Sequence, residues 1–218
     1  MRRCYIAIFL FIAAVAAAAT LPAQAQSTKV RKPDPALDLG TIANGVYQNK
    51  AFALACKIPE GWVLRTDELN ALDEKEKQDA KTKADDKSDA SGPGPKVLLA
   101  AFSRPPEAKG EEINASILIA AESTASYPGL TEAAQYFAPL IEVTKAQGFQ
   151  LDEDPYAIAI GNKTLARGDF HKDRGTRVMR QSTLVMLSHG YAVSITVIAG
   201  TDDDVEDLID GLSFAAGK

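Results

Sequence analysis

Residues 176–199 read TRVMRQSTLVMLSHGYAVSITVIA, and this stretch decides the fold. Two runs rich in β-branched and apolar residues, a composition that favours strands, flank the tripeptide SHG at 188–190. A glycine in so short a connection tolerates the positive φ of a tight hairpin turn. The tripeptide DRG at 173–175 offers the same chemistry after another strand-like run at 164–172. Three consecutive antiparallel strands are therefore predicted.

Upstream of these hairpins the chain carries both strand and helix patterns. One helix is expected at 130–147, with Thr131 as its N-cap, a kink or late start at Pro139, and an end at Gly148. A second is expected at 201–212, where apolar residues recur at i, i+3, i+4 and i+7. Further strand patterns lie at 46–58, 97–103 and 113–121. Together the patterns predict an α+β domain.

The first 25 residues have the pattern of a signal peptide. Arg2 and Arg3 precede an apolar run at 5–19, which is shorter than the roughly 20 residues of a membrane-spanning helix. A small-x-small pattern then predicts cleavage between Ala25 and Gln26, with an uncleaved anchor as the alternative. Loss of two of the 24 basic residues leaves 22 against 29 acidic ones, a net charge of −7 in place of −5. We expect an exported protein, periplasmic or secreted, with no transmembrane segment in the mature chain.

The mature chain divides into a spacer and one domain. Residues 26–44 are polar and rich in proline, which predicts a flexible spacer, so the domain is expected to occupy 45–218. Within it, residues 70–95 form a charged insertion, and 12 of the 17 residues at 73–89 are charged. Such a stretch has no apolar face to bury, so we expect a disordered loop, with a frayed solvent-exposed helix from Asp67 as the alternative.

Cleavage of the leader would remove Cys4 and leave Cys56 as the single cysteine. An internal disulfide is then impossible, and an intermolecular one stays open. Cys56 alternates with apolar residues at 52, 54 and 58, which predicts a buried thiol on the apolar face of a strand.

The chain lacks the sequence signatures of common catalytic and cofactor sites. It has no G-x-S-x-G elbow, no phosphate loop and no G-x-G-x-x-G, and its two histidines have no metal-ligand spacing. The run of three aspartates at 202–204 is explained by a helix start with Thr201 as N-cap. We expect no metal, no cofactor and no catalytic residues, and the negative net charge argues against a nucleic-acid partner.

One feature suggests a binding surface. Residues 163–180 hold six basic side chains against two acidic ones, a local charge of +4 that leaves −11 on the rest of the mature chain. We predict a basic hairpin that binds another envelope protein or an anionic surface. The alternative is that strand edges carry Lys and Arg to discourage edge pairing. The six residues are Lys163, Arg167, Lys172, Arg174, Arg177 and Arg180.

The sequence resembles the PsbP-like domain family, which includes bacterial DcrB-type envelope proteins. The resemblance rests on Tyr-Gln-Asn at 47–49, Phe-Ala-Leu at 52–54 and Ile-Pro-Glu-Gly-Trp at 58–62. It covers about residues 45–214 and implies an antiparallel β-sheet flanked by helices on both faces. The resemblance also implies a non-enzymatic adaptor or assembly role, without catalytic residues to carry over.

These observations together predict an exported, non-enzymatic binding or assembly domain of the bacterial cell envelope. A small-ligand carrier, with an apolar cavity between helix and sheet, is one alternative. A hydrolase with an unrecognised site that uses His171 or His189 is another.

Overall fold

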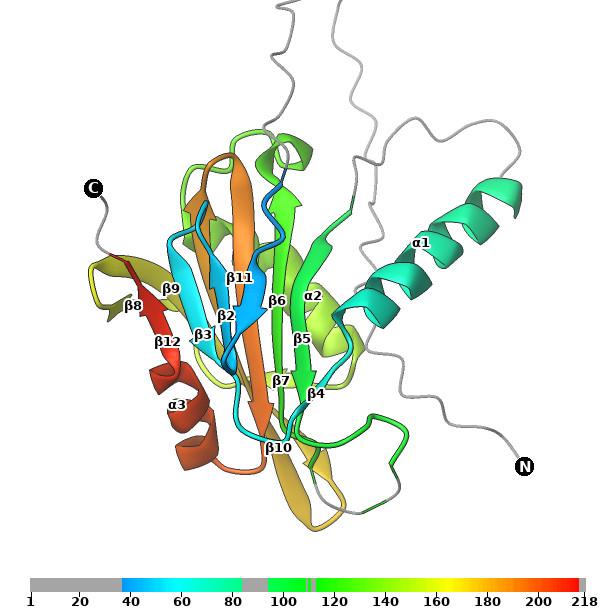
Figure 1. Cartoon of the computed structure of the whole chain (residues 1–218), viewed down its shortest axis with the longest axis vertical. Helices are drawn as coiled ribbons and strands as arrows, with labels where there is room; N and C mark the ends of the chain where they lie inside the picture. The colour runs from blue at the N-terminus through cyan, green and yellow to red at the C-terminus, as the bar shows by residue number, and fades with distance from the viewer. Residues whose placement is uncertain (1–36, 84–93, 109, 111–112, 216–218) are drawn as a thin grey trace, which may run out of the picture.

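The computed structural model describes residues 37–83, 94–108, 110 and 113–215 (Figure 1). The predicted signal peptide, its cleavage between Ala25 and Gln26, and most of the predicted spacer lie outside these residues. Among the described helices, none is long and apolar enough to cross a membrane.

A large antiparallel sheet of eight strands forms the centre of the fold. Its order is β4-β5-β6-β11-β10-β9-β7, and β8 also pairs with β9. The predicted hairpins are confirmed: β10 pairs with both β9 and β11, and the turn to β11 places His189 at φ 51° and Gly190 at φ 82°. The strands are β4 (Val63–Leu64), β5 (Lys96–Phe102), β6 (Ser116–Ser123), β7 (Gln150–Leu151), β8 (Tyr156–Ile160), β9 (Lys163–Arg174), β10 (Arg177–Ser188) and β11 (Tyr191–Ala199).

A second antiparallel sheet joins the two ends of the described chain. Its order is β1-β2-β3-β12, so the last strand pairs with one from near the start. Its inward side chains include Tyr47, Leu54 and Cys56, all 2% exposed or less. The strands are β1 (Thr41–Ala43), β2 (Val46–Asn49), β3 (Leu54–Lys57) and β12 (Leu212–Phe214).

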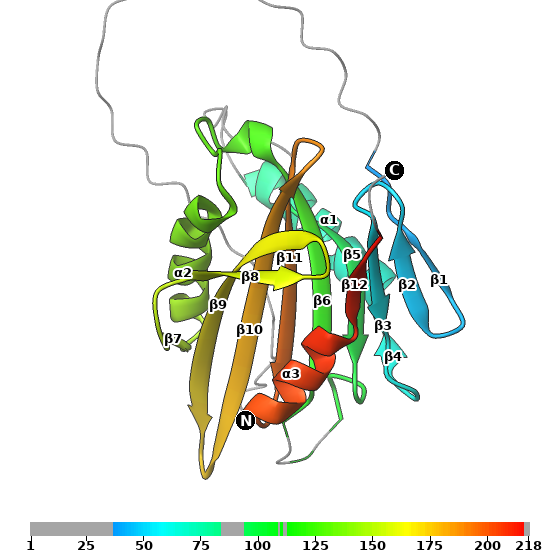
Figure 2. The ribbon, with the colours of Figure 1, turned by 90° about the vertical axis from the view of Figure 1, so that its left-hand side faces the viewer.

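The helices lie on different sides of the central sheet, as Figure 2 shows. On one face, η2 (Ala133–Tyr136) and α2 (Phe137–Ala146) pack a core that includes Phe137, Phe170 and Val185. On the other face, α3 (Asp202–Asp210) and the second sheet share a larger core with the neighbouring strand positions, among them Leu184. The α+β class and the antiparallel sheet are confirmed. The predicted sandwich with helices on both faces differs from the structure, because a second sheet as well as α3 covers one face.

Helix α1 (Thr66–Lys83) projects from the edge strands β4 and β5 (Figure 1). Its first two turns bind the edge of β5, where the Asn70 amide donates to Val97 O at 2.9 Å and accepts from Val97 N at 3.2 Å. Thr66 Oγ1 accepts from Ala100 N at 3.0 Å. The helix therefore satisfies backbone groups of β5 that β4 is too short to reach.

Three predicted boundaries need correction. The domain starts before Gly45, because β1 pairs with β2 and the Tyr47 hydroxyl donates to Leu39 O at 3.1 Å. The predicted disordered loop at 70–95 is helical up to Lys83 in α1, as in the alternative of a helix from Asp67. Residues 84–93 of the predicted loop lie outside the described residues.

The main helix also starts differently from the prediction. Glu132 is the N-cap of η2, and the Gln135 side chain accepts from its backbone N–H at 3.1 Å, so Thr131 is not the cap. The late start is confirmed, because α2 begins at Phe137 and places Pro139 in its first turn, where no helical N–H is lost. Gly148, at φ 86°, follows the end of the helix as predicted.

Candidate functional site

The six residues of the predicted basic hairpin do not form one patch. Side chains alternate between the faces of a strand, and cross-strand partners share a face. Arg167 lies opposite Leu184, which belongs to the core shared with α3. Arg180 lies on the same face of β10 as Leu184, because the two positions differ by an even number of residues, so both arginines face α3. Lys172 belongs to the alternate set, on the face of α2, and Lys163 lies at the far end of β9 beside the turn from β8.

Arg167 is held inside the fold by acidic side chains. Its Nε donates to the Asp169 carboxylate at 2.9 Å, and its other end forms an ion pair with Glu206 of α3 at 2.5 Å. The Tyr156 hydroxyl donates to the same Asp169 carboxylate at 2.8 Å. Burial lowers the pKa of the Arg167 guanidinium, but the bonds to Glu206 and Asp169 outweigh it, and the net shift is upward. With its side chain 12% exposed, Arg167 anchors α3 to the sheet.

Two further basic residues also have partners within the chain. Arg180 forms an ion pair with Asp202, the first residue of α3, at 3.4 Å. Lys172 donates to the carbonyl oxygen of Gln147, and its ammonium lies 5.4 Å from the centre of the Phe149 ring. Part of the local +4 charge is therefore compensated by residues distant in sequence.

Arg174 and Arg177 differ from the other four in being neighbours at the hairpin tip. They lie directly opposite each other, both are exposed, and neither side chain forms a hydrogen bond or ion pair with another described residue. Like charges placed directly opposite on neighbouring strands are unfavourable. Gly175, at φ 65°, makes the turn that brings them together. This arginine pair presents to solvent two positive charges that no ion pair with a described residue engages.

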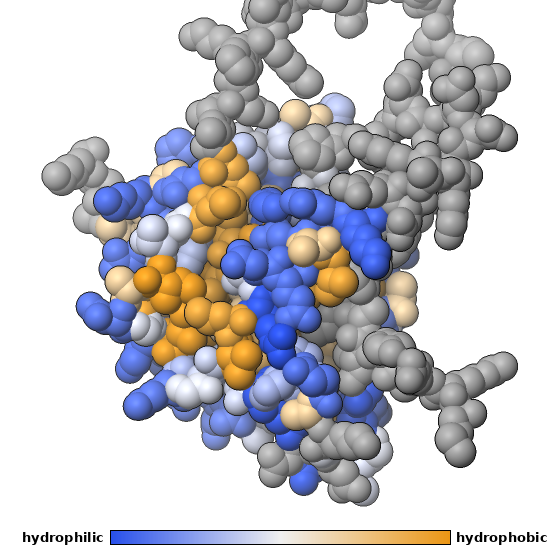
Figure 3. Space-filling model, turned by 45° about the vertical axis from the view of Figure 1, so that its right-hand side comes forward, coloured by the Kyte–Doolittle hydropathy of each residue, from blue (hydrophilic) through white to orange (hydrophobic). Residues whose placement is uncertain are grey.

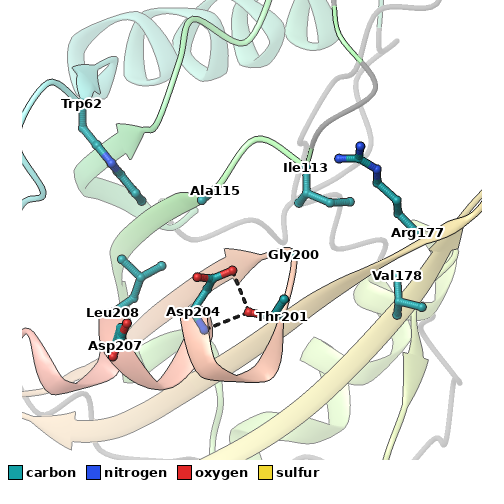
Figure 4. Close-up of a pocket in the computed structure, with 10 residues that line it drawn as sticks. All are labelled: Trp62, Ile113, Ala115, Arg177, Val178, Gly200, Thr201, Asp204, Asp207 and Leu208. Carbon is teal, nitrogen blue, oxygen red and sulfur yellow. Dashed lines mark hydrogen bonds between the residues drawn. The ribbon is translucent and has the colours of Figure 1, made fainter.

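A cleft of about 610 Å³ adjoins this arginine pair (Figure 4). At one end the Trp62 indole points from its turn toward Leu208 of α3, and Asp207 lies next to Leu208 on the helix. At the other end lie Arg177 and Val178 of β10. The remaining lining residues are Ile113, Ala115, Gly200, Thr201 and Asp204. The cleft combines apolar walls with charged groups of both signs, which suits a ligand that is partly apolar and partly ionic.

The chain positions these groups through short turns. Trp62 follows a turn in which its N–H donates to Pro59 O at 3.3 Å, and its side chain packs partly on the core. On the opposite wall, Thr201 Oγ1 accepts from Asp204 N at 3.1 Å and so caps α3, as predicted. The cap fixes the first turn of α3 against the cleft.

A second cleft, of about 700 Å³, lies on the other side of Trp62. Its apolar lining includes Ile42, Val46, Ile58 and Leu64, and Ile42 and Leu64 are more than 40% exposed. Figure 3 shows apolar residues gathered in a patch on this side of the molecule. Trp62 thus separates two surface clefts.

The two histidines lie far apart and share no site. His171 Nδ1 contacts the Asp152 carboxylate, whereas His189 Nδ1 lies 2.9 Å from Ser188 Oγ. His171 lies opposite Arg180 on β10, and Ser188 lies eight residues further along the same strand. At about 3.3 Å per residue, His171 and Ser188 are therefore about 26 Å apart. The serine and the His–Asp pair therefore do not combine into a triad.

Other titratable groups have structural surroundings. Cys56 is buried as predicted, and burial raises the pKa of its thiol to about 12. The carboxylate of Glu122 is buried and accepts from the Tyr127 hydroxyl at 3.0 Å and the Tyr136 hydroxyl at 2.6 Å. Within the described part of the chain, no cluster of three or more His, Cys, Asp or Glu side chains could hold a metal ion.

The sequence-based reasoning missed the cleft. It used Trp62 only for the family resemblance and Asp207 not at all. The available signal was that the single tryptophan of the chain follows a Pro-Glu-Gly turn, where an indole is only partly covered. That α3 would lie across from it depends on the pairing of β12 with β3, which no local pattern indicates.

Comparisons with known proteins leave the family open. No family model matches the chain, and no curated protein matches it. Among solved structures, cyanobacterial PsbP (CyanoP) from Synechocystis is similar, with 14% identity, a TM-score of 0.44, and coverage of 81% of this chain and 99% of that one.

Two other solved structures are similar over smaller parts. LpqN, involved in cell envelope biogenesis of Mycobacterium tuberculosis, has 14% identity and a TM-score of 0.35, covering 75% of this chain and 83% of that one. A Pseudomonas aeruginosa protein of unknown function has 21% identity and a TM-score of 0.33, covering 46% and 68%. All three TM-scores lie below 0.5, and such likenesses carry no argument about function.

Proposed function

We propose that this protein is a non-enzymatic binding domain of the bacterial cell envelope, exported to the periplasm or secreted, with a PsbP-like sandwich fold. It docks an anionic group of another envelope protein at the arginine pair formed by Arg174 and Arg177. The signal-peptide pattern, with cleavage between Ala25 and Gln26, supports the export.

The observation that carries the proposal is the contrast within the basic hairpin. Arg167 and Arg180 are paired with acidic residues of α3, whereas the side chains of Arg174 and Arg177 face solvent beside each other and form no ion pair with a described residue. Two guanidinium groups side by side match a carboxylate or phosphate, which each guanidinium can bind through two N–H groups. An acidic partner group also relieves the repulsion between the two arginines.

Affinity capture from envelope extracts tests this docking site. Wild-type protein is compared with Arg174→Glu/Arg177→Glu and with a control, Lys145→Glu/Lys163→Glu, which changes the net charge equally away from the tip. We expect the first variant to lose a partner that wild type and control retain, and we expect that partner to elute early as salt rises. Identical partner lists for all three proteins would remove the arginine pair as a docking site.

The two clefts beside Trp62 favour one second candidate, a small-ligand carrier. Both clefts are open to the surface, whereas the sequence predicted a cavity between helix and sheet. Native mass spectrometry of protein purified from its own host would detect a retained ligand. A carrier is expected to show an added mass that Trp62→Ala lacks, and an unliganded spectrum would count against it.

A further inference from the structure

The acidic side chains of α3 form two rows with different surroundings. Asp202 and Glu206, four residues apart, face the hairpin and form ion pairs with Arg180 and Arg167. Asp204 and Asp207, three residues apart, line the Trp62 cleft. In the first row, the carboxylates of α3 therefore bind arginine side chains of the sheet.

Among the described residues, no such cation pairs with the row in the cleft. Asp204 accepts from the Thr201 hydroxyl at 2.7 Å, and Asp207 forms no ion pair with a described residue. Arg177, the basic residue of the cleft, stands at its opposite end (Figure 4). The Asp207 end of the cleft therefore carries a negative charge that forms no ion pair with a described residue.

The wall beside Asp207 is aromatic and apolar. The Trp62 indole points toward Leu208, and Asp207 follows on the far side of Leu208 (Figure 4). Leu208 is 9% exposed. Cations bind over the face of an indole, and the aliphatic stem of a lysine or arginine packs on apolar surface while its head stays polar. An indole, a leucine and a free carboxylate together match a basic side chain better than a purely apolar one.

We propose that the cleft binds an extended peptide segment of a partner protein, with a lysine or arginine side chain between Trp62 and Asp207 and an acidic group at Arg177. This inference rests on the proposed function, because Arg177 belongs both to the arginine pair and to the cleft. Charge complementarity selects the occupant: each end of the cleft meets a group of opposite sign, and the apolar walls between them cover the stem. The second cleft, whose exposed lining is mainly apolar, offers no comparable pair of charges.

Trp62 is the only tryptophan of the chain, so its fluorescence reports on the cleft directly. The probe is the blocked peptide acetyl-Arg-Ala-Ala-Asp-amide, and the matched probe replaces arginine with neutral citrulline. We expect a saturable change in emission with the first peptide and binding about fivefold weaker with the second, the size of one cation–π or ion-pair contact.

Variants then locate the bound peptide. Asp207→Asn is expected to weaken the arginine peptide about fivefold, whereas Asp203→Asn, on an exposed position of α3 outside the cleft lining, leaves it unchanged. Arg177→Gln weakens binding, and Lys145→Gln, at an exposed position of α2 outside the cleft lining, leaves it unchanged. Absence of a saturable change, equal binding of both probes, or equal effects of Asp207→Asn and Asp203→Asn would overturn the inference.

The outcomes separate this inference from the proposed function. Saturable peptide binding by the wild-type protein, together with unchanged partner capture by the Arg174→Glu/Arg177→Glu variant, would keep the cleft and reject the docking pair. Lost capture with no peptide response would keep the docking pair and reject the cleft.

Discussion

Replacing Arg167 tests whether the basic hairpin is divided between the fold and the surface. Arg167→Gln removes two bonds to Asp169, at 2.9 and 3.1 Å, and the 2.5 Å ion pair with Glu206. A hydrogen bond to a charged group contributes about 1.5–3 kcal/mol, but Glu206 is 53% exposed, so water replaces much of its bond. Asp169, 21% exposed, keeps the Tyr156 hydroxyl. We expect a loss of about 2–3 kcal/mol in the free energy of unfolding.

The matched control is Arg174→Gln, an identical change at the exposed hairpin tip. Surface substitutions of this kind usually change stability by less than about 0.5 kcal/mol. In a chain of this size 1 kcal/mol shifts Tm by about 2–4 °C, so Arg167→Gln should lower Tm by about 4–12 °C in a thermal scan followed by circular dichroism. A Tm for Arg167→Gln equal to that of Arg174→Gln would refute the reasoning, because Arg167 would then be as free for partners as the tip.

Two further predictions concern the core and the tyrosines. A Cβ on Gly168 would lie 2.5 Å from Phe137 Cε1. Gly168→Ala should therefore lower the free energy of unfolding, measured by denaturant titration, by about 1–3 kcal/mol. Adding Phe137→Leu should recover part of that loss. Additive losses in the double variant would contradict the contact. Burial raises the pKa of Tyr47 to about 12, and the pKa values of Tyr127 and Tyr136 are also raised, chiefly by burial. Because these folded-state pKa values exceed the ordinary value of 10, the associated stability is complete below pH 10 and falls as the pH rises toward 12. Absorbance near 295 nm should show these three hydroxyls ionising only with unfolding, and reversible ionisation near pH 10 in the folded protein would oppose the assignment.

The sequence predicts the long hairpins and α3 well because their signals are local. The turn at 188–190 specifies strand pairing, and the apolar spacing of Val205, Leu208 and Ile209 specifies the buried helix face. The predicted helix at 201–212 is too long, because α3 ends at Asp210 and Leu212 begins β12. Short strands are different: β4 has two residues and β12 has three, too few for any period to show. Their positions depend on partners far along the chain, as in the pairing of Leu212 with Cys56.

The candidate site could be predicted only in part for the same reason. The composition of residues 163–180 reveals the basic charge but not which side chains are compensated. Arg167 and its partner Glu206 are 39 residues apart, and their ion pair exists only once α3 packs on the sheet. Charge counts therefore indicate only the hairpin as a whole, and the alternation of faces separates its structural arginines from the exposed pair.

Cross-linking at the hairpin tip tests the central claim most directly. A photo-reactive amino acid replaces Thr176, which lies in the turn between Arg174 and Arg177, and the protein is irradiated in its own host. We predict a discrete adduct with one envelope protein that disappears in the Arg174→Glu/Arg177→Glu variant and is absent when the probe replaces Lys145 on α2. An adduct that survives the charge reversal, or that forms equally from Lys145, would contradict the account.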